Sequence, residues 1–301
     1  MTKGREMLKG LLLLLRPLPV LSWSGGACLL AVGLVGRAGV RVSFASLLRL
    51  LAVAGLIQGW LAHSLNDLVD WRSGTDVAAK EVLSGGSGAL RLGYLDAEQL
   101  LPIACLSVVL VAGLIHGQTN NYMIYVYLLV GLWGAIAYSQ PPWCLAYTPL
   151  LGEWLAAFPA IVACSLAFYQ GLEGRLDFFS VAAAVAHGLF CVAWLMQHHL
   201  PDWQRDLQAS PPKRTTVACV AARFGVQAGR LVVVVYFLLT TFLALALSFV
   251  ERRLLATALL ASLGGLLAYR QNATSRRDMA RRELQMVGLS LLHVWALGWL
   301  L

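Results

Sequence analysis

Charged side chains are scarce in this sequence. Asp, Glu, Lys and Arg together make up 13% of its 301 residues, whereas a soluble domain usually carries about 25%. Hydrophobic residues reach 59%, so the composition excludes an ordinary water-soluble domain. Lipid is the solvent that fits, and in lipid only helices and closed barrels satisfy their own backbone hydrogen bonds.

Paired metal-binding cysteines are also lacking. No CxxC pair occurs, and most cysteines lie in apolar runs, where Cys behaves as a small hydrophobic residue. We therefore expect neither a disulfide nor a zinc site. The acidic spacing and terminal Glu of an EF-hand calcium loop are missing as well. The six cysteines are Cys28, Cys105, Cys144, Cys164, Cys191 and Cys219.

Long apolar runs are what the sequence has instead. They are continuous rather than alternating, which favours helices over a barrel. Most approach the roughly 20 residues that cross a bilayer. We therefore predict an all-α, multi-pass membrane protein, with residues 1–301 as a single domain. The nine predicted spans are Pro17–Val35, Ser43–Ala62, Gln99–Ile115, Met123–Tyr138, Leu150–Phe168, Phe178–Met196, Leu231–Val250, Leu254–Tyr269 and Leu284–Leu301.

The basic residues are distributed unevenly between the two sides of this arrangement. Of the 23 Lys and Arg residues, 17 fall on the side of the N-terminus and 6 on the other. Positive charge is enriched in cytoplasmic loops, so we place the N-terminus and the even-numbered loops in the cytoplasm, in a bacterial or archaeal cell membrane. The net charge of +8 is then a topology signal that requires no nucleic-acid partner.

Acidic residues gather after the second and sixth spans, both on the predicted cytoplasmic side. In each cluster two oxygen-bearing side chains are four residues apart, which places them on one face of a helix. His198 would extend the second row by one turn. The first cluster lies in SLNDLVDWRSGTD and the second in HHLPDWQRD; together they contain Asn66, Asp67, Asp70, Asp76, Asp202 and Asp206.

Carboxylate and amide oxygens are ligands for hard cations such as Mg²⁺, which commonly bridge carboxylates to a phosphate. Basic residues near both clusters could neutralise that phosphate. The two clusters therefore predict a site for Mg²⁺ and a diphosphate. Helix capping is the alternative role for such acids. The nearby basic residues are Arg72, Lys80, Lys213 and Arg214.

Five stretches of the sequence resemble the UbiA superfamily of intramembrane prenyltransferases. NDLVDWRSGTD is similar to its first aspartate motif, NDxxDxxxxxD, and PDWQRD followed by KRT resembles the second. YSQPPWCLAYTPLLGE, from Tyr138 to Glu153, looks like the stretch between its fourth and fifth helices. LSGGSGAL and LLRPLPVL look closest to the branch that prenylates 1,4-dihydroxy-2-naphthoate in menaquinone synthesis.

The resemblance implies a fold of nine helices around a central cavity. It also implies the reaction that takes place there. Mg²⁺ bound to the catalytic residues Asn66, Asp70, Asp202 and Asp206 would hold a polyprenyl diphosphate, whose ionised prenyl group an aromatic acceptor attacks. Asp67, Asp76 and His198 would complete the metal-binding set. Arg16 is a candidate partner for an acceptor carboxylate, and Tyr138 and Trp143 for the walls of its pocket. No obligate protein partner is evident.

Other interpretations of the sequence stay open. The acceptor could instead be 4-hydroxybenzoate, a glycerol phosphate lipid or a chlorophyll precursor, and a terpene cyclase would use the same acids without an acceptor. A transporter or a binding protein would belong to another class. The sequence also departs from the family pattern at His198, at Pro211-Pro212, and at Cys144 and Thr148, where relatives often carry basic residues.

The charge bias predicts where reporters fused to this chain will lie. Fusions after Asp76, or between Asp206 and Arg230, should report the cytoplasm, and a fusion after Arg253 should report the outside. Paired phosphatase and fluorescent-protein fusions would measure this. If the two acidic loops report opposite sides, they cannot share one metal ion.

Overall fold

The computed structural model describes residues 2–77, 84–116, 121–172 and 174–300. Within these ranges the chain is helical and contains no strand, so the predicted all-α class is confirmed. The elements are α1 Thr2–Leu15, α2 Pro17–Ser22, α3 Ser24–Arg37, α4 Phe44–Ala54, η1 Gly55–Ala62, α5 His63–Ser73, α6 Ala97–Ile115, α7 Tyr122–Ala137, η2 Leu145–Tyr147, η3 Gly152–Ala157, α8 Phe158–Gly171, α9 Phe178–His199, α10 Trp203–Gln208, α11 Thr216–Phe224, α12 Val226–Ser248, α13 Leu254–Arg270, α14 Arg276–Trp295 and η4 Ala296–Leu300.

Every predicted span falls on a helical segment of the structure. In the described chain, five helical stretches are long and apolar enough to cross a membrane: Phe44–Ser73, Ala97–Ile115, Gly152–Gly171, Phe178–His199 and Val226–Ser248. A sixth crossing is available if the pair Lys3–Ser22 and Ser24–Arg37, bent by 45°, counts as one. Helices α7 and α13 are apolar but shorter, so the number of nine crossings stays a prediction.

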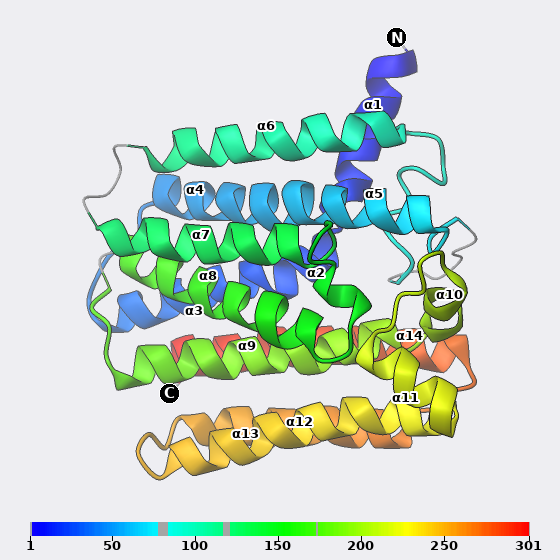
Figure 1. Ribbon diagram of the computed structural model, residues 1–301. Helices are drawn as coiled ribbons and strands as arrows, with labels where there is room; N and C mark the ends of the chain where they lie inside the picture. The colour runs from blue at the N-terminus through cyan, green and yellow to red at the C-terminus, as the bar shows by residue number, and fades with distance from the viewer. Residues whose placement is uncertain (1, 78–83, 117–120, 173, 301) are drawn as a thin grey trace.

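The long helices run side by side along one direction (Figure 1). Helix α9 is the most enclosed of the five spanning stretches, with 83% of its most apolar window buried, and it packs against α8, α12 and α14. Outer helices instead expose apolar residues, such as Leu101, Leu106 and Val109 of α6, which are 53%, 55% and 66% exposed. A continuous apolar exterior of this kind matches contact with lipid.

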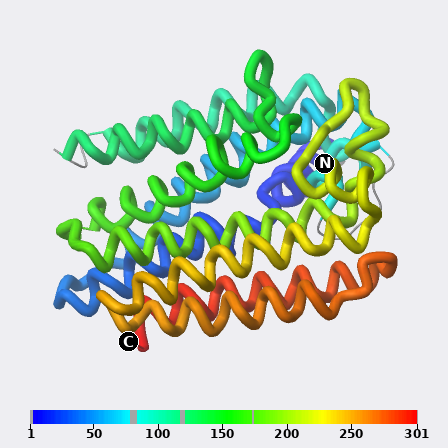
Figure 2. The backbone as a smooth tube through the Cα atoms, turned by 60° about the horizontal axis from the view of Figure 1, so that its bottom comes forward, coloured from blue at the N-terminus to red at the C-terminus, as the bar shows by residue number. Residues whose placement is uncertain are grey.

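The chain starts and finishes at opposite ends of this bundle. Figures 1 and 2 place α10 and the N-terminal helix near one end, with the C-terminus at the other. Helix α1 stops at Arg16, whose backbone is left-handed with φ 46°. Helix α4 passes through the π-helical segment η1 into α5. The two termini therefore lie at opposite ends of the bundle, which is the arrangement that an odd number of membrane crossings would produce.

Close backbone contact between α3 and η4 predicts the effect of a small substitution. A Cβ atom added at Gly33 would lie 2.7 Å from the backbone of Gly298, which is too short for van der Waals contact. We expect Gly33→Ala to lower the free energy of unfolding by about 1–3 kcal/mol. Thermal unfolding in detergent would measure this.

Gly36 provides the matched control on the same helix, because a Cβ atom there would meet nothing within 4 Å. Gly36→Ala should leave stability unchanged or raise it slightly, since Ala favours the helix. Equal loss of stability in both variants would mean that the contact with Gly298 does not matter.

Candidate functional site

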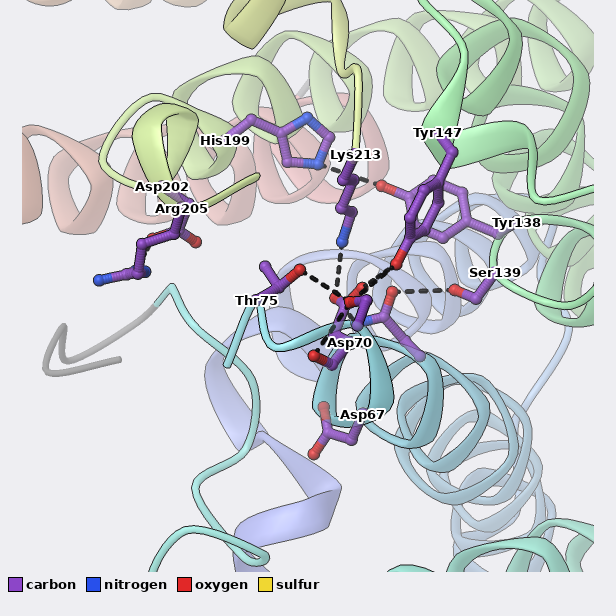
Figure 3. A network of polar contacts seen from close by, with 12 residues as sticks. Asp67, Asp70, Thr75, Tyr138, Ser139, Tyr147, His199, Asp202, Arg205 and Lys213 are labelled. Carbon is purple, nitrogen blue, oxygen red and sulfur yellow. Dashed lines mark hydrogen bonds and ion pairs between the residues drawn. The ribbon is translucent and has the colours of Figure 1, made fainter. Parts of the chain in front are cut away.

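The two acidic clusters meet at the end of the bundle where α5 ends and α10 begins (Figure 3). Lys213, in the segment after α10, connects them. Its Nζ atom lies 2.6 Å from Asp70 Oδ2, and its backbone N–H donates to the Asp206 carbonyl oxygen at 2.7 Å. Both Lys213 and Asp70 are buried. Residues far apart in the sequence therefore form one site.

Asp70 lies at the centre of a hydrogen-bond network. Besides Lys213, it accepts hydrogen bonds from Asn66 Nδ2 at 2.9 Å and from the Tyr147 hydroxyl at 3.1 Å. The Lys213 ammonium also lies over the Tyr147 ring, 5.7 Å from its centroid. Asn66 Oδ1 accepts from Ser139 Oγ at 2.9 Å. The Asn66–Asp70 spacing thus forms a row on one helix face, as the sequence predicted.

The remaining carboxylates surround this network. Asp67 points away from Lys213 in Figure 3 and accepts a hydrogen bond from the Ser87 backbone N–H at 3.1 Å. Asp202 accepts from Ser84 Oγ at 3.0 Å and pairs with Arg205. The glycine-rich segment that begins at Ser84 therefore lies over both acidic clusters.

Negative charge is in excess at this end of the molecule. Five carboxylates are buried, those of Asp67, Asp70, Asp76, Asp202 and Asp206. Burial, reinforced by Asp70 and Asp67, raises the pKa of Asp76 well above its usual range. Burial likewise raises the pKa of Asp206, although Lys213 opposes the shift. Burial disfavours the charged form of Lys213, but Asp70 and Asp206 outweigh it and hold its pKa well above the usual range.

This set of side chains fits a divalent cation chemically. All the donors are oxygen atoms, which Mg²⁺ prefers, and the buried Asp76 Oδ2 has no hydrogen-bond partner in the described chain. A cation would compensate the cost of burying these carboxylates in their charged form and the repulsion between them. Among the described residues, no three His, Cys, Asp or Glu side chains are grouped so that they could hold a metal ion. The Asp70 carboxylate is paired with the Lys213 ammonium.

A cavity of about 310 Å³ opens from this acidic end into the bundle. Asn66, Asp70, Asp76, Asp202, Asp206 and Lys213 line its polar end. The rest is mainly apolar and extends to the opposite ends of α6, α7 and α8, where Ile115, Ile124 and Leu172 line it. The expected central cavity is therefore present, with its charge confined mainly to one end.

His198 lines the cavity but turns to partners that the sequence did not suggest. Its Nδ1 lies 2.7 Å from Glu283 Oε1, and its Nε2 lies 3.1 Å from Arg16 Nη2. Glu283, on α14, is 1% exposed. The row predicted with Asp202 would have made His198 a metal ligand, whereas here the imidazole bridges an arginine and a buried carboxylate.

The other predicted binding residues divide into two groups. Arg16 and Tyr138 line the cavity, and the Tyr138 hydroxyl lies 3.1 Å from His199 Nε2. Arg72 and Arg214 are exposed and do not line it. Trp143 packs on Trp133 with ring centroids 5.1 Å apart and is also absent from the lining. Lys80 lies outside the described residues.

Sequence reasoning missed two residues that the structure brings to the site. Ser139 lies in the stretch between α7 and α8 that resembled the prenyltransferase family, but no spacing rule connects it to Asn66. Glu283 borders the last apolar run, and a carboxylate at the edge of a membrane helix is itself a signal of function. Its position in the sequence could therefore have indicated Glu283.

An all-helical membrane bundle with an acidic end and a deep apolar cavity is the class that this fold and site define. Solved structures of UbiA homologues share the fold. One from Archaeoglobus fulgidus, bound to GPP and Mg2+, aligns with 96% of this chain and 99% of its own, at TM-score 0.67 and 14% identity. One from Aeropyrum pernix K1, without ligand, covers 95% of both chains at TM-score 0.57 and 13% identity.

These similarities concern the fold. No protein-family model matches the sequence, and no curated protein matches it. The predicted resemblance to the UbiA superfamily is confirmed for the fold over nearly the whole chain. With its apolar helices, this fold makes the chain an integral membrane protein. The assignment to the dihydroxynaphthoate branch stays a prediction.

The buried pair of Lys213 and Asp70 predicts a measurable coupling. Lys213→Met should lower the free energy of unfolding by about 3–5 kcal/mol in metal-free buffer, because it leaves buried carboxylates uncompensated. Adding Asp70→Asn should recover part of the loss, since it removes one of those charges. Thermal unfolding of the single and double variants in detergent would measure the cycle.

Arg214→Met is the control, because Arg214 is the next residue and is exposed. We expect it to change stability by less than about 0.5 kcal/mol. A Lys213→Met protein as stable as the unmodified chain would contradict the electrostatic role given to Lys213.

Proposed function

We propose that this protein is a Mg²⁺-dependent intramembrane prenyltransferase that uses a prenyl diphosphate as donor. The observation that carries the proposal is the meeting of both acidic clusters at the polar end of one deep apolar cavity. A prenyl diphosphate has the same division, with a charged head and an apolar tail. Head and tail would therefore each find a matching part of a single cavity.

Structural neighbours support this assignment. Two of the Archaeoglobus fulgidus structures are described as bound to GPP and Mg2+ and to DMAPP and Mg2+. Both share the fold of this chain over at least 94% of its length. The acids that the present structure gathers supply the oxygen ligands that such a cation requires.

Each group of side chains has a separate task in this proposal. Asn66, Asp70, Asp202 and Asp206 would hold the cation, with Asp67 and Asp76 as further ligands or supports. When bound, Mg²⁺ supplies neutralising charge to the leaving diphosphate. Lys213, buried at the same place, would add a second positive charge there. The exposed Arg72 and Arg214 are less suited to this task.

We propose an electron-rich aromatic compound as acceptor, with 1,4-dihydroxy-2-naphthoate, and hence menaquinone synthesis, as the first choice. The supporting observation is Arg16, a cation that lines the cavity and suits a carboxylate partner. 4-Hydroxybenzoate, a glycerol phosphate lipid and a chlorophyll precursor are the alternative acceptors. Release of a cyclic hydrocarbon without an acceptor would identify a terpene cyclase.

Purified protein tests the function directly. With Mg²⁺, a labelled prenyl diphosphate and a panel of these acceptors, we expect a prenylated aromatic product, identified by mass. Asp70→Ala and Asp202→Ala should each lower turnover about 100-fold or more, because each removes stabilisation of leaving-group charge. EDTA should abolish the activity, and added Mg²⁺ should restore it.

Glu98→Gln is a suitable control because Glu98 is exposed at the start of α6. It should retain the activity of the unmodified protein. Full turnover in EDTA, or in the Asp70→Ala, Asp202→Ala double variant, would refute the metal site. Transport of an ionic substrate without any prenyl transfer would show that the protein is a transporter and not a prenyltransferase.

A further inference from the structure

Arginines gather at the start of α14, at the same end of the bundle as α10 and the acidic clusters (Figure 1). They are Arg276, Arg277, Arg281 and Arg282, and Asp278 is the acidic residue of the first turn. The start of a helix carries the positive end of its dipole, which favours negative groups. Arg276 and Arg277 oppose this preference, so an anion bound from outside would stabilise the first turn of α14.

The carboxylate of Asp278 is shared among several donors. Its Oδ1 atom lies 2.9 Å from Arg281 Nη2, and its Oδ2 atom accepts a hydrogen bond from the Asn272 backbone N–H at 2.7 Å. Arg277 and Arg270, the last residue of α13, are both exposed. Within the described chain neither of them has a hydrogen bond or an ion pair. Positive charge is therefore in excess around the turn between α13 and α14.

Helix α12 adds a further arginine beside this turn. Arg230 Nη1 donates to the Gln271 carbonyl oxygen at 3.0 Å, and the guanidinium lies over the Tyr269 ring, 5.5 Å from its centroid. The buried Arg230 Nε atom has no hydrogen-bond partner in the part of the chain that the structure describes. The start of α12, the end of α13 and the start of α14 thus form one basic corner, which consists of Arg230, Arg270, Arg276, Arg277, Arg281 and Arg282.

The exposed face of α14 continues from these arginines into an apolar surface. Leu284, Leu292 and Trp295 are 47%, 44% and 47% exposed. Steps of three or four residues put them on one helix face together with Arg281 and the exposed Gly288. An apolar face of this kind on a membrane helix contacts the acyl chains of lipids. The arginines therefore lie at the level where acyl chains give way to head groups.

We propose that the basic corner binds the head group of an anionic phospholipid. Arg270 and Arg277 donate to its head-group oxygens, and an acyl chain lies along the exposed face of α14, over Leu284, Gly288 and Leu292. A guanidinium matches a phosphate with two parallel hydrogen bonds. None of the six arginines lines the cavity, so this site is separate from the acidic one, and the inference does not depend on the proposed function.

A membrane lipid fits this surface better than a soluble anion does. Free phosphate would use the arginines alone, whereas a lipid also contacts the apolar residues beside them. An acidic protein or a nucleic acid would reach the arginines only by entering the head-group layer. Clusters of basic residues next to a membrane helix attract anionic lipids, by about fivefold in affinity for each residue.

The opposite face of the same turns packs on α9 beside the cavity. Glu283 Oε1 lies 2.7 Å from His198 Nδ1, and Gln197 Nε2 donates to the Met279 carbonyl oxygen at 3.3 Å. A head group bound to the outer face would therefore stabilise a helix end on which the wall of the cavity rests. Because the lipid binds the folded protein, it should raise the unfolding temperature.

Lipid binding to the purified protein in a neutral detergent tests the inference. Native mass spectrometry would measure the affinities for phosphatidylglycerol, which is anionic, and phosphatidylcholine, which has no net charge. We expect phosphatidylglycerol to bind about 25-fold more tightly, since two arginines contribute about fivefold each. In the Arg270→Gln, Arg277→Gln double variant this preference should fall below about fivefold. Phosphatidylglycerol should also raise the unfolding temperature of the unmodified protein more than phosphatidylcholine does.

Arg37→Gln, Arg41→Gln is the matched control, because it removes the same charge from two exposed positions at the other end of the bundle, the last residue of α3 and the loop after it. It should keep the preference for phosphatidylglycerol. The unfolding temperature without lipid checks that both double variants are folded. Soluble glycerol 3-phosphate and an RNA oligonucleotide, offered as competitors, distinguish a lipid from other anions and should not displace it.

Three results would overturn the inference. Equal affinity of the unmodified protein for the two lipids would mean that no head-group site exists. An equal loss of preference in the control variant would mean that net charge, and not the basic corner, attracts the lipid. Displacement of the lipid by an equal concentration of glycerol 3-phosphate or RNA would assign the arginines to a soluble anion or a nucleic acid. The first and third results need the unmodified protein alone, so they decide the question even if a variant does not fold.

Discussion

The attraction between buried Lys213 and the carboxylates around it is the interaction on which the site depends. Like charges in a low-dielectric interior repel each other and lose their hydration. Asp70 and Asp206 come from different parts of the chain, and Lys213 holds them together through its ammonium and its backbone N–H. The end of α5 and the segment around α10 are thereby joined where the polar part of the cavity lies.

The apolar part of the cavity follows from a different property of the sequence. Small residues line it where α7 and α8 meet: Gly131, Gly134, Ala156 and Ala160. Close packing between such residues lets helices approach without filling the space beside them. The outer helices carry larger apolar side chains, which face the lipid. The chain therefore has an apolar cavity inside the bundle and an apolar surface outside it.

Much of the site was predictable because helix periodicity is local. The four-residue spacing of Asn66 and Asp70 determines which side chains share a face, and the structure shows both at the cavity. Spacing carries no information about partners on other helices. For this reason the contact of His198 with Glu283, 85 positions away, was missed. Residue spacing also does not indicate that Lys213 is buried whereas the adjacent Arg214 is exposed.

The fold was predictable for the same physical reason, with errors where helices break. Apolar runs located every predicted span, since their length and hydropathy are properties of single segments. The sequence did not indicate the left-handed backbone at Arg16 or the π-helical turns at Gly55–Ala62 and Gly152–Ala157. These breaks depend on contacts with neighbouring helices.

The direction in which Asn66 and Asp70 face depends on how many residues η1 contains as well as on which residues they are. Each residue of a regular helix advances the chain by about 100°, and a π-helical turn holds more residues than a regular one. The wider turns of η1 therefore accommodate an additional residue and leave Asn66 and Asp70 facing the cavity. The same residue inserted into a regular helix would turn the acidic row by about 100°, and the site would lose its geometry although every site residue remained in the sequence.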